Sequence, residues 1–219
     1  MAQPKKIKEK MKPLLPYHEE AMKHLKKTDP VLYATARAYK GTLAHRITPH
    51  RRNDQLFATL AGSVVSQQLS TKAAASIWKR VQEACGGRVT AKTIDATADE
   101  DLRAAGLSAS KVKTLKALAD AVLSDGLDLL TLKKLPHDEA AGRLTRIWGI
   151  GPWTAEMFFI FALQAPDVFS PGDLGLVRAV ERLYGLPKDA PRADILAIAE
   201  RWTPHRSFAS LVLWEYYDT

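Results

Sequence analysis

The chain has 219 residues, of which 46% are hydrophobic and 26% charged, and its net charge is +8 at pH 7. This length can bury a substantial core, and no apolar run approaches the roughly 18 residues of a membrane-spanning helix. Cys85 is the single cysteine, which excludes a disulfide framework or a cysteine-held iron–sulfur cluster within the chain. The N-terminus has no apolar core and cleavage site of a secretory signal. We therefore expect no membrane partner and a cytoplasmic protein, or a nuclear one in a eukaryote.

The positive charge is concentrated in the N-terminal quarter. Residues 1–52 contain 13 Lys or Arg against 4 Asp or Glu, whereas residues 53–219 contain 19 against 20. Such an excess favours a polyanionic partner, although a solvated tail followed by one basic helix explains it equally well. We expect residues 1–16 to form a basic, flexible lead-in. Whether residues 1–52 contact the partner stays open.

Helical spacing of apolar residues recurs through almost the whole chain, and no convincing β-strand interrupts it. Residues 41–53 are basic and contain proline and histidine, which is typical of a connecting loop. The sequence therefore predicts an all-α fold of about ten to twelve short helices. The expected helices cover residues 17–28, 30–39, 54–66, 71–85, 99–105, 108–126, 137–147, 153–163, 174–184, 193–202 and 207–217.

Gly149-Ile150-Gly151 joins two of these helices by a tight turn. Glycine can follow a turn that other residues cannot, and Pro152 suits the first turn of the next helix, where its missing N–H costs nothing. The unpaired N–H groups at that positive helix end could bind a phosphate. A simple helix–helix connection would have the same local pattern.

Asp173 follows about twenty residues later, in Phe169-Ser170-Pro171-Gly172-Asp173, just before another helix. An aspartate at this place usually caps the helix. The capping role is compatible with a catalytic one, because a carboxylate at a positive helix end can stabilise positive charge nearby.

Together these blocks resemble the helix-hairpin-helix DNA glycosylase superfamily over residues 54–217. The segment from Arg201 to Trp214 is very similar to the 3-methyladenine DNA glycosylase II branch, which acts on alkylated purines. The resemblance implies two helical lobes around a DNA-binding cleft, without an iron–sulfur cluster. We expect one lobe from residues 17–65 plus 186–219 and the other from residues 66–185. The resemblance also implies base flipping and a monomer that binds duplex DNA containing damaged purines.

The resemblance makes Asp173 the catalytic residue, which stabilises the sugar or activates water. It places Trp153 and Trp214 in the base pocket, with Met157 at a position where the branch can carry an aromatic residue. Relatives that also cut the strand carry a lysine at position 153, and tryptophan cannot form their Schiff base. We therefore expect a monofunctional enzyme without lyase activity.

Ser66-Gln67-Gln68-Leu69-Ser70 matches the loop that fills the gap left by a flipped nucleotide, a requirement of base flipping. The resemblance favours Gln68 as the plug, with Leu69 second. It also predicts phosphate contacts from the amides around the hairpin and from surface lysines. These residues are Gly149, Gly151, Trp153 and Lys113, with Lys111 as a further candidate.

No cofactor is required by the resemblance, but such hairpins often hold a Na⁺ or K⁺ ion. Its ligands here would be the backbone carbonyls of Thr145, Ile147 and Ile150. Two alternatives stay open: a superfamily glycosylase for oxidised or mismatched bases, and a non-catalytic helix-hairpin-helix DNA-binding protein. The missing lysine at position 153 and the lack of four cysteines argue against an enzyme of the endonuclease III type.

Overall fold

The computed structural model describes residues 16–39, 47 and 52–218. Within these ranges the chain is helical throughout its regular structure and contains no strand, as the sequence predicts. None of these helices is both long and apolar enough to cross a membrane. Most of the lead-in expected at residues 1–16, and most of the basic loop before residue 53, lie outside the described residues.

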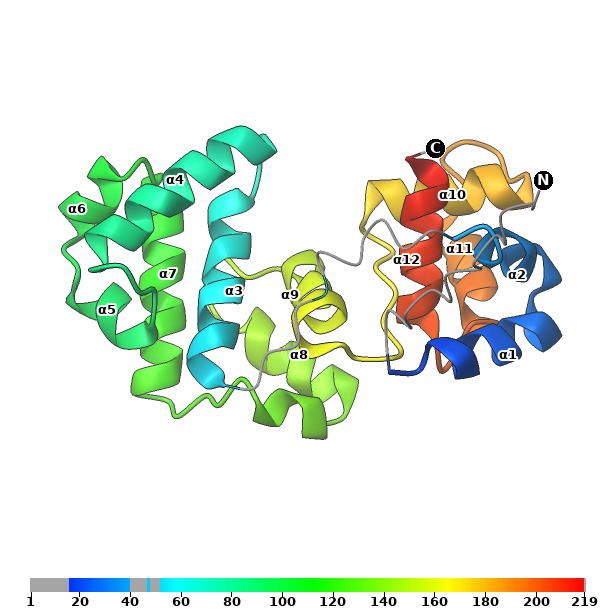
Figure 1. Ribbon diagram of the computed structural model, residues 1–219, viewed down its shortest axis with the longest axis horizontal. Helices are drawn as coiled ribbons and strands as arrows, with labels where there is room; N and C mark the ends of the chain where they lie inside the picture. The colour runs from blue at the N-terminus through cyan, green and yellow to red at the C-terminus, as the bar shows by residue number, and fades with distance from the viewer. Residues whose placement is uncertain (1–15, 40–46, 48–51, 219) are drawn as a thin grey trace, which may run out of the picture.

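The helices follow one another with short connections (Figure 1). Twelve α-helices and two shorter helical turns are described: α1 (His18–Thr28), α2 (Pro30–Ala36), α3 (Asn53–Ser66), α4 (Thr71–Ala84), α5 (Ala91–Ala96), α6 (Asp99–Ala104), α7 (Ala109–Leu123), the 3₁₀ turn η2 (Thr131–Lys134), α8 (His137–Thr145), α9 (Pro152–Phe158), the π-helical turn η3 (Phe159–Leu163), α10 (Leu174–Tyr184), α11 (Arg192–Glu200) and α12 (Arg206–Tyr217).

Two groups of helices lie side by side (Figure 1). In one group, α3 packs on α4, α7 and α9, and α7 also packs on α5 and α6. In the other, α10 and α12 pack on each other and on α2. The boundaries expected from the sequence assign α3 to the second group and α10 to the first, and the structure corrects both. Both helices have buried apolar faces, and nothing in the sequence of such a face identifies the helix that covers it.

A buried aspartate connects the two ends of the chain within the second group. Asp29 is only 2% exposed, and it caps α2 by accepting a hydrogen bond from the Leu32 amide at 2.9 Å. Its other oxygen accepts hydrogen bonds from the Tyr184 hydroxyl at 2.6 Å and the Trp202 indole at 2.9 Å. A buried carboxylate needs such donors, so these contacts fix α2 against the C-terminal helices.

Candidate active site

Asp173 directly precedes α10 and lies where the two groups of helices meet. Its Oδ1 atom accepts a hydrogen bond from the Leu176 amide at 2.9 Å, which confirms that it caps this helix. The segment that leads to Asp173 is held to the start of α12 by hydrogen bonds. There the Arg206 guanidinium donates to Asp167, and the buried Ser207 hydroxyl donates to the Ala165 carbonyl oxygen at 2.6 Å. The position of the carboxylate is therefore set by α12 as well as by α10.

Two indole rings donate hydrogen bonds to the same carboxylate. The Trp153 Nε1–H, from the first turn of α9, donates to Asp173 Oδ2 at 2.8 Å. The Trp214 Nε1–H, from α12, donates to Asp173 Oδ1 at 3.0 Å. Gly175 leaves room for this arrangement, because a Cβ atom there would lie 3.2 Å from Asp173 Oδ1 and 3.5 Å from the Trp214 ring. The structure thus brings together three residues that the sequence placed in one site.

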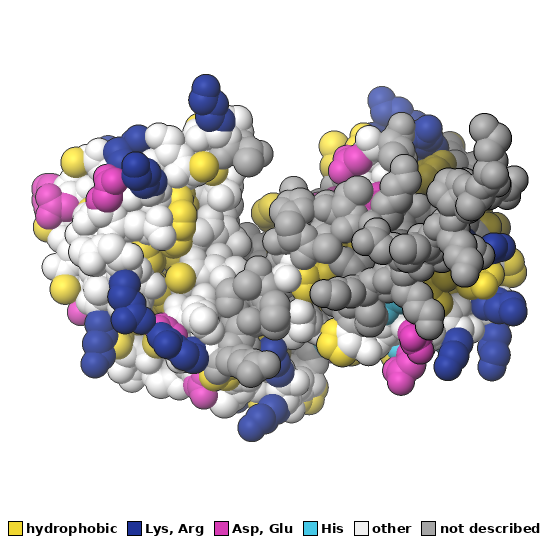
Figure 2. Space-filling model, in the orientation of Figure 1, with side chains coloured by type: hydrophobic (Ala, Val, Ile, Leu, Met, Phe, Trp, Pro, Cys, Tyr) yellow, Lys and Arg dark blue, Asp and Glu magenta, His cyan; other side chains and the backbone are white. Residues whose placement is uncertain are grey.

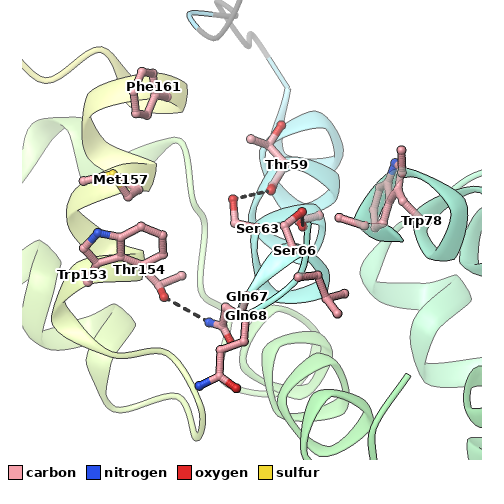
Figure 3. Close-up of a pocket in the computed structure, with 14 residues that line it drawn as sticks. Thr59, Ser63, Ser66, Gln67, Gln68, Trp78, Trp153, Thr154, Met157 and Phe161 are labelled. Carbon is pink, nitrogen blue, oxygen red and sulfur yellow. Dashed lines mark hydrogen bonds between the residues drawn. The ribbon is translucent and has the colours of Figure 1, made fainter. Parts of the chain in front are cut away.

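A pocket of about 980 Å³ opens beside Trp153, between α3 and α9 (Figure 3). Trp153, Met157 and Phe161 lie along one wall, and Thr59, Ser63 and Ser66 of α3 lie along the opposite wall (Figure 3). The loop after α3 and one face of α4 complete the lining. The remaining lining residues are Gly62, Gln67, Gln68, Leu69, Ala74, Ala75, Trp78 and Thr154.

Trp214 contributes to this region indirectly. Its ring stacks on Phe161, with centroids 5.4 Å apart and planes inclined by 25°. Phe161 is not among the predicted site residues, because residues 153–163 are apolar nearly all round and indicate a buried helix. The sequence did contain a signal that Phe161 belongs to the site: residues 153, 157 and 161 recur every four positions and share a helix face. Trp153 is 44% exposed rather than buried.

Glu156 lies on the same helix as Trp153 and contacts the segment that leads to Asp173. Its Oε2 atom accepts a hydrogen bond from the hydroxyl of Ser170, which is completely buried. Burial raises the pKa of the Glu156 carboxyl above its ordinary value, and the nearby charge of Asp173 acts in the same direction. Sequence reasoning does not single out this pair.

The predicted plug residues are at the surface, at one end of the pocket. Gln68 and Leu69 are both exposed, and Gln68 has a left-handed φ of +57°. The preceding Gln67 donates its side-chain amide to the Thr154 hydroxyl at 3.1 Å, which ties the loop to α9 (Figure 3). Gln68 lines the pocket at this end and is also exposed to solvent.

The hairpin turn is held close to α7. Gly149 has a φ of +82°, and a Cβ atom there would lie 2.0 Å from the Thr114 hydroxyl. Gly151 is exposed and precedes α9, where no side chain caps the first amides. These amides are free to meet a phosphate in the way the sequence predicts. The Lys113 ammonium lies 4.3 Å above the exposed Trp148 ring beside this turn.

Lys111, a further candidate for phosphate contact, makes contacts within the protein that the sequence does not predict. Its ammonium donates to the carbonyl oxygens of Val65 at 2.7 Å and Gln67 at 2.8 Å, at the end of α3. Lysine and arginine side chains are otherwise spread over both groups of helices on the face shown in Figure 2. No single basic patch marks the site on the described part of that face.

The predicted cation ligands surround the hairpin as backbone groups. Thr145 ends α8, and the Ile147 carbonyl oxygen accepts a hydrogen bond from the Ile150 amide at 3.1 Å. A carbonyl oxygen has a second lone pair, so this bond is compatible with a monovalent ion. Among the described residues, no cluster of three or more His, Cys, Asp or Glu side chains could hold a metal. The carbonyl site stays a prediction.

Residues 61–205 match the HhH-GPD superfamily of base excision DNA repair proteins. The chain belongs to this superfamily. It is 35% identical to DNA-3-methyladenine glycosylase 1 of Schizosaccharomyces pombe over 162 residues, which is 73% of this chain and 71% of the relative. These matches confirm the superfamily predicted from the hairpin and its resemblance to 3-methyladenine DNA glycosylases.

Two solved structures have the same fold. The crystal structure of a DNA-3-methyladenine glycosidase from Bacillus halodurans superposes with a TM-score of 0.79 at 32% identity, covering 91% of this chain and 89% of the other. The 3-methyladenine DNA glycosylase of Schizosaccharomyces pombe in complex with abasic DNA gives a TM-score of 0.73 at 31% identity, covering 90% and 95%.

Proposed function

We propose that this protein is a monofunctional DNA glycosylase that acts as a monomer on alkylated purines in duplex DNA. The proposal is carried by one observation: the carboxylate of Asp173 is held by two indole N–H groups, and one of those indoles forms the wall of a large pocket. Membership of a base excision repair superfamily supports it, as does the relative solved with abasic DNA.

The pocket suits a flipped purine that carries positive charge. A purine alkylated at N3 or N7 is cationic, and the face of an indole attracts cations. Trp153 offers such a face, and Phe161, stacked on Trp214, extends the aromatic wall. Met157 between them is polarisable and adapts its shape. The wall therefore favours cationic purines over neutral ones of similar size.

Asp173 would act as the glycosidic bond breaks. The bonding electrons leave with the base, which neutralises the cationic purine, and positive charge develops on the sugar. A carboxylate next to C1′ stabilises that charge or accepts the proton of the attacking water. Water adds its oxygen to C1′ and releases a proton, leaving an abasic site and a free base. A general acid is not needed, because the cationic base is already a good leaving group.

Trp153 also argues against the covalent route used by strand-cutting relatives. An indole has no amine that could form a Schiff base with the sugar, and its N–H is engaged by Asp173. Around this centre, the amides of Gly149, Gly151 and Trp153 and the ammonium of Lys113 would contact phosphates. Gln68, with Leu69 beside it, would fill the gap in the duplex.

Asp173→Asn tests the proposal, because asparagine caps helices as well as aspartate does. We expect the variant to fold and bind lesion duplex normally, but to release base at least about 100-fold more slowly in single turnover. Methylated DNA and duplexes containing a single alkylated, deaminated or oxidised purine supply the substrates, with borohydride trapping alongside. Wild-type rates in the variant would refute the catalytic role. Preference for an oxidised purine, or a trapped adduct, would refute the assigned specificity or mechanism.

A further inference from the structure

We propose that Lys111 is a positioning residue that holds the Gln67-Gln68-Leu69 loop in the shape needed to enter DNA. This inference rests on the proposed function, and it concerns a lysine whose ammonium is bonded to backbone carbonyls of the protein. Lys111 lies on α7, behind the loop, and its ammonium donates to the carbonyl oxygens of Val65 and Gln67. Val65 lies in the last turn of α3, and Gln67 is the residue just before Gln68.

The loop needs such support because its backbone is strained. Gln68 has a φ of +57°, a region that residues with a side chain seldom occupy. A strained residue of this kind persists only where its surroundings determine it. Lys111 engages the carbonyl oxygen of Val65, in the last turn of α3, and that of Gln67, directly before the strained residue. A cation at the C-terminal end of a helix is also favoured by the helix dipole.

The loop is held from two sides. Lys111 fixes its backbone from α7, and the Gln67 side chain donates to Thr154 on α9. Gln68 and Leu69 are left exposed between these two anchors. Burial lowers the pKa of Lys111, which agrees with an ammonium partly withdrawn from water for this purpose.

The same face of α7 also supports the hairpin. Thr114 lies one turn after Lys111 and approaches Gly149 so closely that no Cβ atom fits between them. One helix therefore sets the distance between the plug loop and the phosphate-binding turn. The loop that enters the duplex and the turn that binds its phosphates must keep a fixed spacing, and a rigid helix provides it.

The chain contains a matched control on the same helix. Lys116 donates to the carbonyl oxygens of Asp95 at 2.9 Å and Thr97 at 2.7 Å, at the end of α5 rather than in the plug loop. Lys111→Met and Lys116→Met each remove an ammonium from two backbone carbonyls while keeping an apolar stem. Only the first change frees the plug loop. If Lys111→Met fails to fold, Thr154→Val takes its place in the same measurements, because it removes the second anchor of the loop.

Two measurements test the role. Base release in single turnover is compared between a lesion paired with its normal partner and the same lesion opposite an abasic-site analogue, where flipping is easier. We expect the rate of base release by Lys111→Met to fall about ten- to a hundredfold on the paired lesion and clearly less on the unpaired one. Lys116→Met should match wild type on both. The deciding quantity is the rate on the paired lesion divided by the rate on the unpaired one. If this ratio is the same in Lys111→Met and wild type, the proposal is overturned.

The second measurement needs no catalysis. A duplex with 2-aminopurine opposite an uncleavable abasic analogue reports on plug insertion through the fluorescence of that base. Wild type and Lys116→Met should change the fluorescence on binding, and Lys111→Met should change it little at saturating protein. Equal changes in all three proteins would refute the positioning role. If wild type releases no base from any duplex, the proposed function fails, while this binding signal still decides the role of Lys111.

Discussion

Replacing Gly149 by alanine should destabilise the protein through one identifiable contact. The added Cβ atom would lie 2.0 Å from Thr114 Oγ1 and 2.9 Å from both Thr114 Cβ and Cγ2. Thr114 is 2% exposed and sits inside α7, so a change of rotamer cannot remove all three contacts. The φ of +82° adds a backbone penalty of about 1–2 kcal/mol for any residue with a Cβ atom.

Overpacking a tight contact costs about 1–3 kcal/mol, so the combined loss is about 2–5 kcal/mol. A typical domain is stable by about 5–15 kcal/mol, which makes this a large but survivable fraction. Urea unfolding followed by circular dichroism measures it. Thermal melting should show a fall in Tm of about 4–20 °C for a chain of this size.

Gly151→Ala is the matched control in the same turn. Gly151 has a φ of −87°, and an added Cβ atom would meet no other atom within 4 Å, so we expect a loss of about 1 kcal/mol or less. Thr114→Ala should reduce the cost of Gly149→Ala, because it removes two of the three contacts. Equal stability of Gly149→Ala and Gly151→Ala would refute the reasoning.

Two further changes probe the carboxylates of the site. Trp214→Phe keeps an aromatic ring beside Phe161 but removes one donor to Asp173, so single-turnover base release should slow about tenfold or more with DNA binding unchanged; an unchanged rate would show that the indole N–H is dispensable. Burial raises the pKa of Glu156 above 4.5, so its contribution to folding is most favourable when protonated and declines as pH rises through the raised pKa. Glu156→Gln should therefore gain stability relative to wild type in urea titrations as the pH rises above about 4.5, whereas a pH-independent difference would contradict this sign.

The helices could be predicted from the sequence wherever an apolar period was long enough to be distinct. Ala91–Ala96 was missed, because six residues with only Ala91 and Ile94 buried form too short a pattern. The predicted helix at residues 153–163 ends in a π-helical turn, which the apolar pattern does not reveal. The residue before a helix is more informative: Ser70, Ser108 and Asp173 cap the helices that follow them, a role that serine and aspartate side chains favour.

The candidate site was predictable where single residues carry the chemistry, and less so where contacts cross the fold. The cap at Asp173 and the role of glycine at position 149 follow from local geometry. The position of Lys111 does not, since its partners are more than 40 residues away and no local pattern joins them. Its contacts with the end of α3 could not be predicted from the sequence for that reason. The assignment of α3 and α10 to their groups likewise depends on tertiary contacts.

The two oxygens of Asp173 show why its capping role does not account for its surroundings. Oδ1 accepts hydrogen bonds from the Leu176 amide and the Trp214 indole, which occupy its two lone pairs. Among the described residues, Oδ2 accepts one hydrogen bond, from Trp153, so one of its lone pairs is left over. A helix cap requires Oδ1 alone. The oxygen that capping leaves unused is also the one hydrogen-bonded to the indole that lines the pocket, as the catalytic role proposed for Asp173 requires.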